Sequence, residues 1–412
     1  MLSALCQNRW MTDRQSRGEF LALMAAASAT IAIAIDAMLP AFAAVREQFG
    51  LATTSSDAAL IITFFMVGVG VGQFVYGPLA DRFGRKPVFM AGLALYVVAG
   101  FATALAPSLG VLLSGRFLWG LGAAGPRVVA QAMLRDRFKG DPLARALAII
   151  LTIFLIVPTI APVLGQLILQ LGSWRYTFAV GPFFGLVVGL WSTRVTETLD
   201  ESNRRDLDFR SIARSTLEVM RTPSALGNTF ALFAMTAAFL PYLGSSERMY
   251  GEIYGRGNQF FAWFALTSVA MAGFTLTTSR IVTRLGTRRT TMSVLVLLVG
   301  VAAVNVVVTH RANGVPGFVF FVIATVLLVS LNTALTPLLT SRALDDVGHI
   351  AGTAASTIGG ITLIGGSLLS PIVDGAIAGS VTPFAVAHLV FGAIALTATM
   401  LTDKRTAKEA SP

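Results

Sequence analysis

The stretch GPLADRFGRKP, residues 77–87, stands between two long apolar runs and carries Asp81, Arg82, Arg85 and Lys86. Only 13% of the 412 residues are Asp, Glu, Lys or Arg, so this concentration of charge is unusual for the chain. It marks a polar connection between two segments that are themselves almost free of charge. The nature of those segments decides the fold.

The segments on either side have the composition of membrane helices. Hydrophobic residues make up 55% of the chain and its mean hydropathy is +0.73, whereas soluble domains are nearer half apolar and about a quarter charged. A helical crossing of the bilayer needs roughly 20 apolar residues. The apolar runs are continuous and do not alternate with period two, which favours helices over a β-barrel. Twelve runs are predicted, at 20–42, 58–80, 88–106, 110–133, 145–170, 175–193, 225–245, 258–279, 290–309, 316–338, 350–372 and 382–401.

The net charge of +10 raises the question of a nucleic-acid partner, and the positions of the basic residues answer it. If both termini lie on one side of the membrane, 24 of the 31 Lys and Arg residues fall in connections on that side and five on the other. This asymmetry is the positive-inside pattern. We therefore predict cytoplasmic termini, a lipid bilayer as surroundings and no nucleic-acid partner.

The opening stretch has a weaker copy in the second half of the chain. A shift of 202 residues aligns it with SRIVTRLGTRR at 279–289, placing Arg82 on Arg284 and Gly84 on Gly286. Because this shift is close to half the chain length, we predict an all-α integral membrane protein with two pseudo-symmetric six-helix bundles. The expected parts are a cytoplasmic tail 1–19, a first bundle 20–194, a cytoplasmic linker 195–223, a second bundle 224–402 and a tail 403–412. Residues 209–221 form either an interfacial amphipathic helix or part of a solvated linker.

Three further motifs, together with the opening stretch, carry a resemblance to a known family. They are IDAMLP at 35–40, GRFLWGLGAA at 115–124 and IVPTIAPVLGQLI at 156–168. The chain resembles the major facilitator superfamily, and within it the bicyclomycin/chloramphenicol-resistance branch of twelve-span drug:proton antiporters. The resemblance implies twelve transmembrane helices in two bundles, with a substrate site between the repeats that opens alternately to either side.

This resemblance also implies a function. We expect a proton-coupled secondary transporter that exports small amphipathic compounds across a bacterial inner membrane, with one proton per cycle and acting as a monomer. A proton symporter that imports a small metabolite remains the alternative. A membrane enzyme or sensor would need a catalytic cluster or an added soluble domain, and the sequence has neither. No cofactor or metal is expected, because the three histidines, His310, His349 and His388, match no metal-binding spacing.

The resemblance assigns the charged stretch a role as a latch between the bundles. Asp81 stands at the negative end of a helix, where a carboxylate needs a positive partner. The family pattern implies that Asp81 docks at the start of helix eleven, near residues 350–352, and that Arg85 pairs with Asp136. The alternative is that the basic residues only anchor the topology. The expected latch comprises Gly77, Asp81, Arg82, Gly84, Arg85 and Asp136.

Ionisable residues within membrane spans are costly and are therefore functional candidates. Asp36 in the first run and Arg116 in the fourth are expected at similar depth in the outer half of the bilayer. We predict that Asp36 is the main protonation site and that Arg116 modulates it by its proximity. The alternative is a static pair that joins two helices.

Arg127 follows Arg116 by eleven residues, which is three helical turns to within about 20°. If their shared face lines the cavity, its positive field favours neutral or anionic solutes. Alternatively, Arg127 reaches the cytoplasmic surface and joins Asp136. The expected substrate cavity comprises Arg127, Trp119, Gly120 and Asn332. Trp119 either forms an aromatic wall of this cavity or faces lipid.

A hinge is expected in helix five, at Pro158, Pro162 and Gly165.

Overall fold

The computed structural model describes residues 16–52, 55–204 and 209–409, and among these it contains helices and no β-strand. Eight stretches of the described chain are long and apolar enough to cross a membrane, and the longest, Phe318–Ala376, contains two helices. Three further long helices, α6, α7 and α8, pack against these stretches. The predicted all-α architecture is confirmed. The twelve long helices are α2 (Arg17–Asp36), α4 (Leu60–Phe83), α5 (Arg85–Ala104), α6 (Leu109–Arg137), α7 (Asp141–Leu169), α8 (Trp174–Ser192), α10 (Pro223–Arg248), α11 (Phe260–Leu285), α12 (Thr287–Arg311), α13 (Phe318–Leu344), α14 (Ala351–Ala376) and α15 (Thr382–Glu409).

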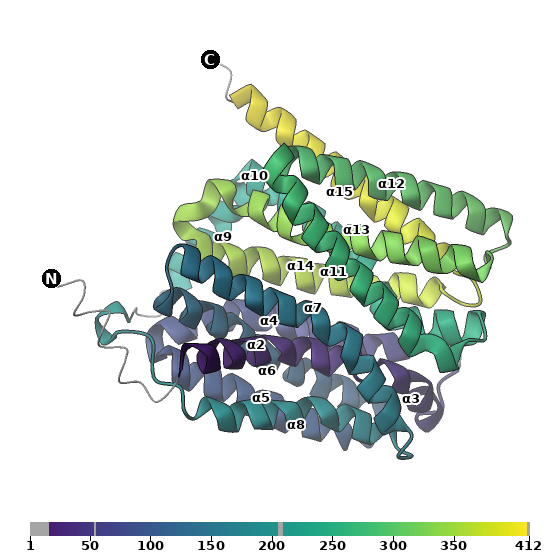
Figure 1. Ribbon diagram of the computed structural model, residues 1–412, viewed down its shortest axis with the longest axis horizontal. Coiled ribbons are helices and arrows are strands. Elements are labelled where there is room, and N and C mark those ends of the chain that lie inside the picture. The colour runs from purple at the N-terminus through teal and green to yellow at the C-terminus, as the bar shows by residue number, and fades with distance from the viewer. Residues whose placement is uncertain (1–15, 53–54, 205–208, 410–412) are drawn as a thin grey trace.

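The helices form two bundles that lie side by side (Figure 1). The first contains α2 to α8, coloured purple to teal, and the second contains α10 to α15, coloured teal to yellow. The start of α2 and the end of α15 lie at the same end of the molecule, which we call the terminal end; the opposite end is the distal end. Between the bundles, α4 packs on α14 and α7 packs on α11.

The internal repeat has a structural counterpart at two glycines. Gly84 separates α4 from α5 with φ of 99°, and Gly286 separates α11 from α12 with φ of 77°. Both angles lie in the left-handed region, which glycine adopts without the steric penalty of a Cβ. The shift of 202 residues therefore aligns two tight helix junctions with the same backbone requirement.

The first predicted run, 20–42, is interrupted where a continuous helix was expected. Helix α2 ends at Asp36, a 3₁₀ turn follows at Leu39–Ala41, and α3 (Phe42–Gln48) completes the crossing. Pro40 explains the interruption, because it has no N–H to donate within a helix. The break leaves main-chain oxygens at the end of α2 without helical donors.

The polar segment between the bundles contains α9 (Phe209–Arg221), with the bounds that the sequence predicts. This helix packs against α10 and α14. Its Thr216 hydroxyl lies 3.2 Å from that of Thr357, and Glu218 lies 2.7 Å from Nε2 of His349. The linker is thus attached to the terminal end of the second bundle.

Candidate functional site

A cavity of about 820 Å³ lies between the two bundles in the half of the molecule nearest the chain termini. Helices α4 and α6 form its wall on one side, and α10, α13 and α14 form the other. Its lining mixes aromatic, amide and hydroxyl side chains, a combination suited to an amphipathic solute. Representative lining residues are Gln73, Phe74, Gln131, Thr336, Thr340 and Ser356.

At the distal end the bundles are in contact. Nη2 of Arg46, in the first bundle, donates to Glu247 at 2.9 Å and to Glu252 at 2.6 Å, both in the second bundle. Ser56 approaches Gly375 closely enough that a Cβ at the glycine would lie 3.4 Å from the serine Oγ. The structure is therefore closed at the distal end, on the opposite side of the molecule from the cavity.

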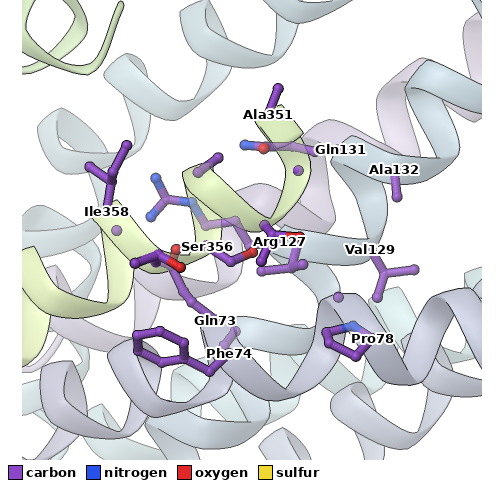
Figure 2. A pocket seen from close by; sticks show the side chains of 18 of the residues that line it. Gln73, Phe74, Pro78, Arg127, Val129, Gln131, Ala132, Ala351, Ser356 and Ile358 are labelled. Atoms are coloured by element: carbon purple, nitrogen blue, oxygen red, sulfur yellow. The ribbon is translucent and has the colours of Figure 1, made fainter. Parts of the chain in front are cut away.

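Arg127 lines the cavity from α6. Figure 2 shows its side chain extending into the cavity, on whose other side α14 carries Ser356. The side chain of Asp136, the other expected neighbour of Arg127, accepts from Nε of Arg85 at 3.0 Å and from the hydroxyl of Thr198 at 3.2 Å. This position favours the cavity assignment of Arg127, whose effect on substrate choice is proposed below.

Trp119 lies inside the first bundle and away from the cavity, which differs from both expected positions. Its side chain is 1% exposed. Its ring packs edge-on against Phe65, at 6.0 Å between centroids, and against Tyr96, at 5.7 Å. Trp119 precedes Gly120 by one residue, which is about 100° around the helix. Its side chain therefore points away from the face of Arg116 and Gly120 and toward Tyr96 of α5.

Asn332 and Gly120 are also packed within their own bundles and do not line the cavity. Asn332 is 2% exposed and its Nδ2 donates to the main-chain oxygen of Met235 at 3.0 Å. A Cβ at Gly120 would lie 2.0 Å from the main-chain oxygen of Phe65 in α4. Gly120 thus allows the close approach of α4 and α6. Of the four residues expected in the cavity, the structure brings only Arg127 to its wall.

Gly120→Ala should destabilise the protein, because the new methyl group meets rigid backbone of α4. We expect a loss of about 2 kcal/mol, typical of overpacking, seen as a lower thermal midpoint in detergent. Gly110→Ala is the matched control in the same helix, since no neighbour lies within 4 Å of the added Cβ. If the two variants are equally stable, the packing role of Gly120 is wrong.

Asp36 is the last residue of α2, directly before the break in the first crossing. It is 5% exposed. On one side, α7 approaches so closely that a Cβ at Gly165 would lie 1.9 Å from the main-chain oxygen of Ala37. Across the boundary between bundles, Tyr242 of α10 lies within electrostatic range of Asp36. A carboxyl group is thus enclosed where the two bundles meet.

Arg116 of α6 is completely buried and joins three helices. Nε donates to the main-chain oxygen of Ile61 in α4 at 3.1 Å, and Nη1 donates to that of Ala34 in α2 at 3.0 Å. The guanidinium carbon lies 4.2 Å from the ring centroid of Phe65, a cation–π contact. Arg116 therefore contacts α2 at Ala34, two residues before Asp36. No ion pair joins the side chains of Arg116 and Asp36 in the described structure.

The expected latch residues form one cluster at the terminal end. Arg85 donates from Nε to Asp136 at 3.0 Å and from Nη1 to Asp81 at 2.5 Å. In this conformation Asp81 accepts from Arg85 and does not dock at the start of α14. Asp81 and residues 350–352 line the same cavity. Gly77 also faces the cavity, and Arg82 lies over the ring of Phe83.

Glu197 completes this cluster, and sequence reasoning missed its role. Its Oε1 accepts from the N–H of Arg85 at 2.9 Å and its Oε2 from that of Lys86 at 3.1 Å, which caps the start of α5. A Cβ at Gly84 would lie 2.6 Å from Oε2, so this position requires glycine for space as well as for φ. The only sequence signal was an acidic residue shortly after the sixth run.

The expected hinge residues lie in α7, which belongs to the first bundle and packs against α11 of the second. Pro158 and Pro162 are inside α7, and the main-chain oxygen of Pro158 accepts from the hydroxyl of Ser268 in α11 at 3.4 Å. Prolines leave main-chain oxygens without helical donors, and a neighbouring hydroxyl satisfies one of them here. Together with Gly165, these residues give α7 contacts to both bundles.

Similar proteins belong to one family of membrane proteins. The model of the Major Facilitator Superfamily matches residues 21–366. A bicyclomycin resistance protein homolog of Haemophilus influenzae is 26% identical over 365 residues, which cover 88% of this chain and 90% of that protein. The multidrug resistance protein MdtL of Salmonella paratyphi A is 32% identical over 329 residues, covering 76% of this chain and 78% of that protein.

Solved structures share the fold at low sequence identity. The human organic anion transporter MFSD10 (TETRAN) aligns with a TM-score of 0.71 and 15% identity, covering 94% of this chain and 100% of that one. The xylose transporter XylE from E. coli, in a partially occluded inward open conformation, aligns with a TM-score of 0.72 and 11% identity, covering 94% and 98%. These likenesses show that the two-bundle arrangement is a known one.

Proposed function

The chain belongs to the Major Facilitator Superfamily, and from that premise we propose that it exports small amphipathic compounds in exchange for protons. It is a multi-pass membrane protein, and the resemblance to the drug:proton antiporters is confirmed by relatives named for bicyclomycin and multidrug resistance. The observation that carries the proposal is the cavity of about 820 Å³ between the bundles, which are in contact at the distal end. A site between two repeats, open to one side at a time, is the arrangement that alternating access needs.

We propose that Asp36 holds the exchanged proton and that Arg116 positions it. The carboxyl of Asp36 is buried where the bundles meet, at the end of α2, and Arg116 is bonded to the same helix end. Movement of α2 against α6 changes the distance between the carboxyl and the guanidinium, and with it the stability of the ionised form. Binding of a proton is thereby linked to the conformation of the cavity.

The terminal end is assigned to the cytoplasm of a bacterial inner membrane, with the chain acting as a monomer. The excess of basic residues on the terminal side supports this orientation. In this orientation the cavity takes solute from the cytoplasm. The divisions 1–19, 20–194, 195–223, 224–402 and 403–412 are proposed as tail, bundle, linker, bundle and tail.

The cluster at the terminal end is proposed as the latch of the opposite conformation. When the cavity closes on the cytoplasmic side, Asp81 exchanges Arg85 for the start of α14, and Arg85 keeps Asp136. Asp81, residues 350–352 and Gly77 already face one cavity, which supports this exchange. Pro158, Pro162 and Gly165 are proposed as the hinge of α7.

Transport by the purified protein in proteoliposomes tests the function. With the membrane potential clamped at zero, an imposed pH gradient should drive uphill accumulation of a lipophilic drug, and the drug alone should drive proton movement in the opposite direction. Protein-free vesicles and a protonophore are the controls. Drug and proton moving in the same direction would establish the symporter instead, and uphill transport driven by sodium or ATP would contradict proton exchange.

Arg127→Ala should change which solutes are exported. Removing the guanidinium from the cavity wall removes a positive field, so export of a cationic dye relative to an anionic dye of similar size should rise about tenfold. Arg145→Ala, which removes an exposed cytoplasmic-side arginine, is the charge-matched control. An unchanged ratio in Arg127→Ala would exclude the residue from substrate selection.

A further inference from the structure

A second buried carboxyl group lies in the other bundle, at the distal end. Asp374 of α14 is completely buried, and among the buried side chains that the structure describes, it and Asp36 are the two acids. Its Oδ1 accepts from the hydroxyl of Ser245 at 2.5 Å, and its Oδ2 accepts from that of Ser370 at 2.8 Å. The predicted run 350–372 ended two residues before Asp374, so the sequence placed it in a connection.

Asp374 belongs to a group of charges that is not neutral. Arg248 donates to the main-chain oxygen of Asp374 and to Oγ of Ser245, and it lies within electrostatic range of Arg46, Glu247, Glu252 and Asp374. These five side chains comprise two positive and three negative groups when all are ionised. This group therefore carries one negative charge in excess, and Asp374 is its only acid without exposed surface. An uncompensated charge out of water is costly, and one bound proton removes it.

Asp374 is the acid best placed to take that proton. Both glutamates bond directly to the guanidinium of Arg46 and keep some exposure, 13% for Glu247 and 31% for Glu252. The carboxylate oxygens of Asp374 instead accept from two serine hydroxyls in the described structure, and the residue has no exposed surface. The remaining ionisable groups on the packed elements differ: Asp57 and Glu47 have solvent access, and His388 of α15 faces the main-chain oxygen of Phe384.

The carboxyl of Asp374 lies directly beneath the contact that closes the distal end. A Cβ at Gly244 would lie 2.9 Å from Oδ1 of Asp374 and also 2.9 Å from Cβ of Ala59 in the first bundle. The next residue of α14, Gly375, lies against Ser56. Gly244 thus lies between this carboxyl and the opposing bundle. Opening of the distal end would bring water closer to the carboxyl.

We propose that Asp374 is a proton-binding site of the distal gate, and that a proton taken from the outer side stabilises the closed gate. The ionised carboxylate is better solvated when the gate is open, and the neutral acid costs less to bury when it is shut. A ligand that binds one conformation better shifts the population toward it. The inference rests on the proposed alternating access, and it adds a gate-controlling acid in the second bundle to the exchanging acid Asp36 in the first.

The nearby arginine favours a proton over a metal cation at this site. Four oxygens from Asp374, Ser245 and Ser370 resemble part of a sodium site. However, Arg248 already donates to Oγ of Ser245, which places a fixed positive charge beside those oxygens. A sodium ion would be repelled there, whereas a proton is carried by the carboxyl itself.

Labelling of a gate cysteine tests the inference without any transport assay. In a Cys6→Ser background, Ser56→Cys reports the open gate through reaction with an impermeant maleimide added outside right-side-out vesicles. Gln48→Cys, at an exposed outer position, gives the reference rate that corrects for thiol ionisation. Lowering the external pH from about 8 to about 5 should reduce the corrected labelling about tenfold.

The variant Asp374→Asn should lose this response and label slowly at every pH, because the amide imitates the neutral acid. Glu47→Gln, an exposed outer acid, should retain the parent response. An Asp374→Asn protein that retains the parent response would overturn the proposal, and so would labelling that follows external sodium at constant pH. Loss of proton-driven transport with an intact labelling response would instead contradict the proposed function and leave the gate site standing.

Paired variants cover the case in which Asp374→Asn does not fold. Ser370→Ala and Ser245→Ala each remove a hydroxyl that donates to the ionised carboxylate. Without one of these donors the ionised carboxylate is less stable relative to the neutral acid, so the midpoint of the labelling response should move to higher pH. Midpoints equal to the parent's in both variants would contradict the assignment of the proton to Asp374.

Discussion

Asp36→Asn should abolish proton-driven accumulation while leaving downhill exchange of solute in place. With one proton exchanged per solute and no membrane potential, a pH difference of about one unit can hold about a tenfold solute gradient. The amide is close to the carboxyl in size but cannot carry the proton, so the variant should hold no gradient. The cavity residues lie elsewhere, and counterflow between labelled and unlabelled drug should continue.

Asp141→Asn is the matched control for this experiment. It is the same substitution at an exposed position at the start of α7, and it should sustain the parent gradient. If Asp36→Asn accumulates drug as well as the parent does, the proton is carried by another group. If counterflow is lost as well, the acid contributes to binding or folding and the assignment fails.

Arg116→Ala should destabilise the protein more than Gly120→Ala does. The guanidinium donates to two main-chain oxygens, those of Ala34 in α2 and Ile61 in α4, and its removal also leaves a cavity beside Phe65. Hydrogen bonds from a charged group contribute about 1.5–3 kcal/mol each, so we expect a loss of about 3 kcal/mol or more. The thermal midpoint in detergent measures it.

Arg116→Lys separates the structural role of Arg116 from its charge. Lysine keeps the positive charge but lacks the planar fork that reaches both oxygens, so it should recover only part of the stability. Arg311→Ala, at an exposed end of α12, is the control for loss of an arginine. If Arg116→Ala is no less stable than this control, the bonds to α2 and α4 do not hold the bundle together.

Patterns that depend on neighbouring residues were predicted well. The apolar runs identified the twelve helices, because continuous hydropathy is the main requirement of a membrane span. The shift of 202 residues identified the two junction glycines, because a left-handed residue between helices favours glycine wherever it occurs. The bounds of α9 followed from its amphipathic pattern.

Features that depend on contacts between distant segments were not predicted. Periodicity along α6 showed that Arg116, Gly120 and Arg127 share one side, but it did not show which neighbour each one meets at its own depth. Arg116 meets α2 and α4, whereas Arg127 reaches the cavity. Glu197 is more than a hundred residues from the helix that it caps, and no local rule connects them.

Asp374 shows a different reason for failure. Hydropathy falls at an aspartate, so a run that ends before it places the residue in a loop. In the structure α14 continues to Ala376, and two serines on α10 and α14 supply the hydrogen bonds that allow burial. Burial of a polar group depends on partners from other helices, and their positions become known only with the fold.

Paired distance measurements with spin labels test alternating access most directly. One pair, Gln48→Cys and Ala376→Cys, spans the bundles at the distal end; the other, Lys139→Cys and Ser341→Cys, spans them at the terminal end, all at exposed positions in a Cys6→Ser background. Alternating access predicts reciprocal changes between acidic and alkaline buffer: the distal distance lengthens at alkaline pH while the terminal distance shortens. Distances that change together, or neither changing while the protein transports drug, would contradict exchange through one cavity between two moving bundles.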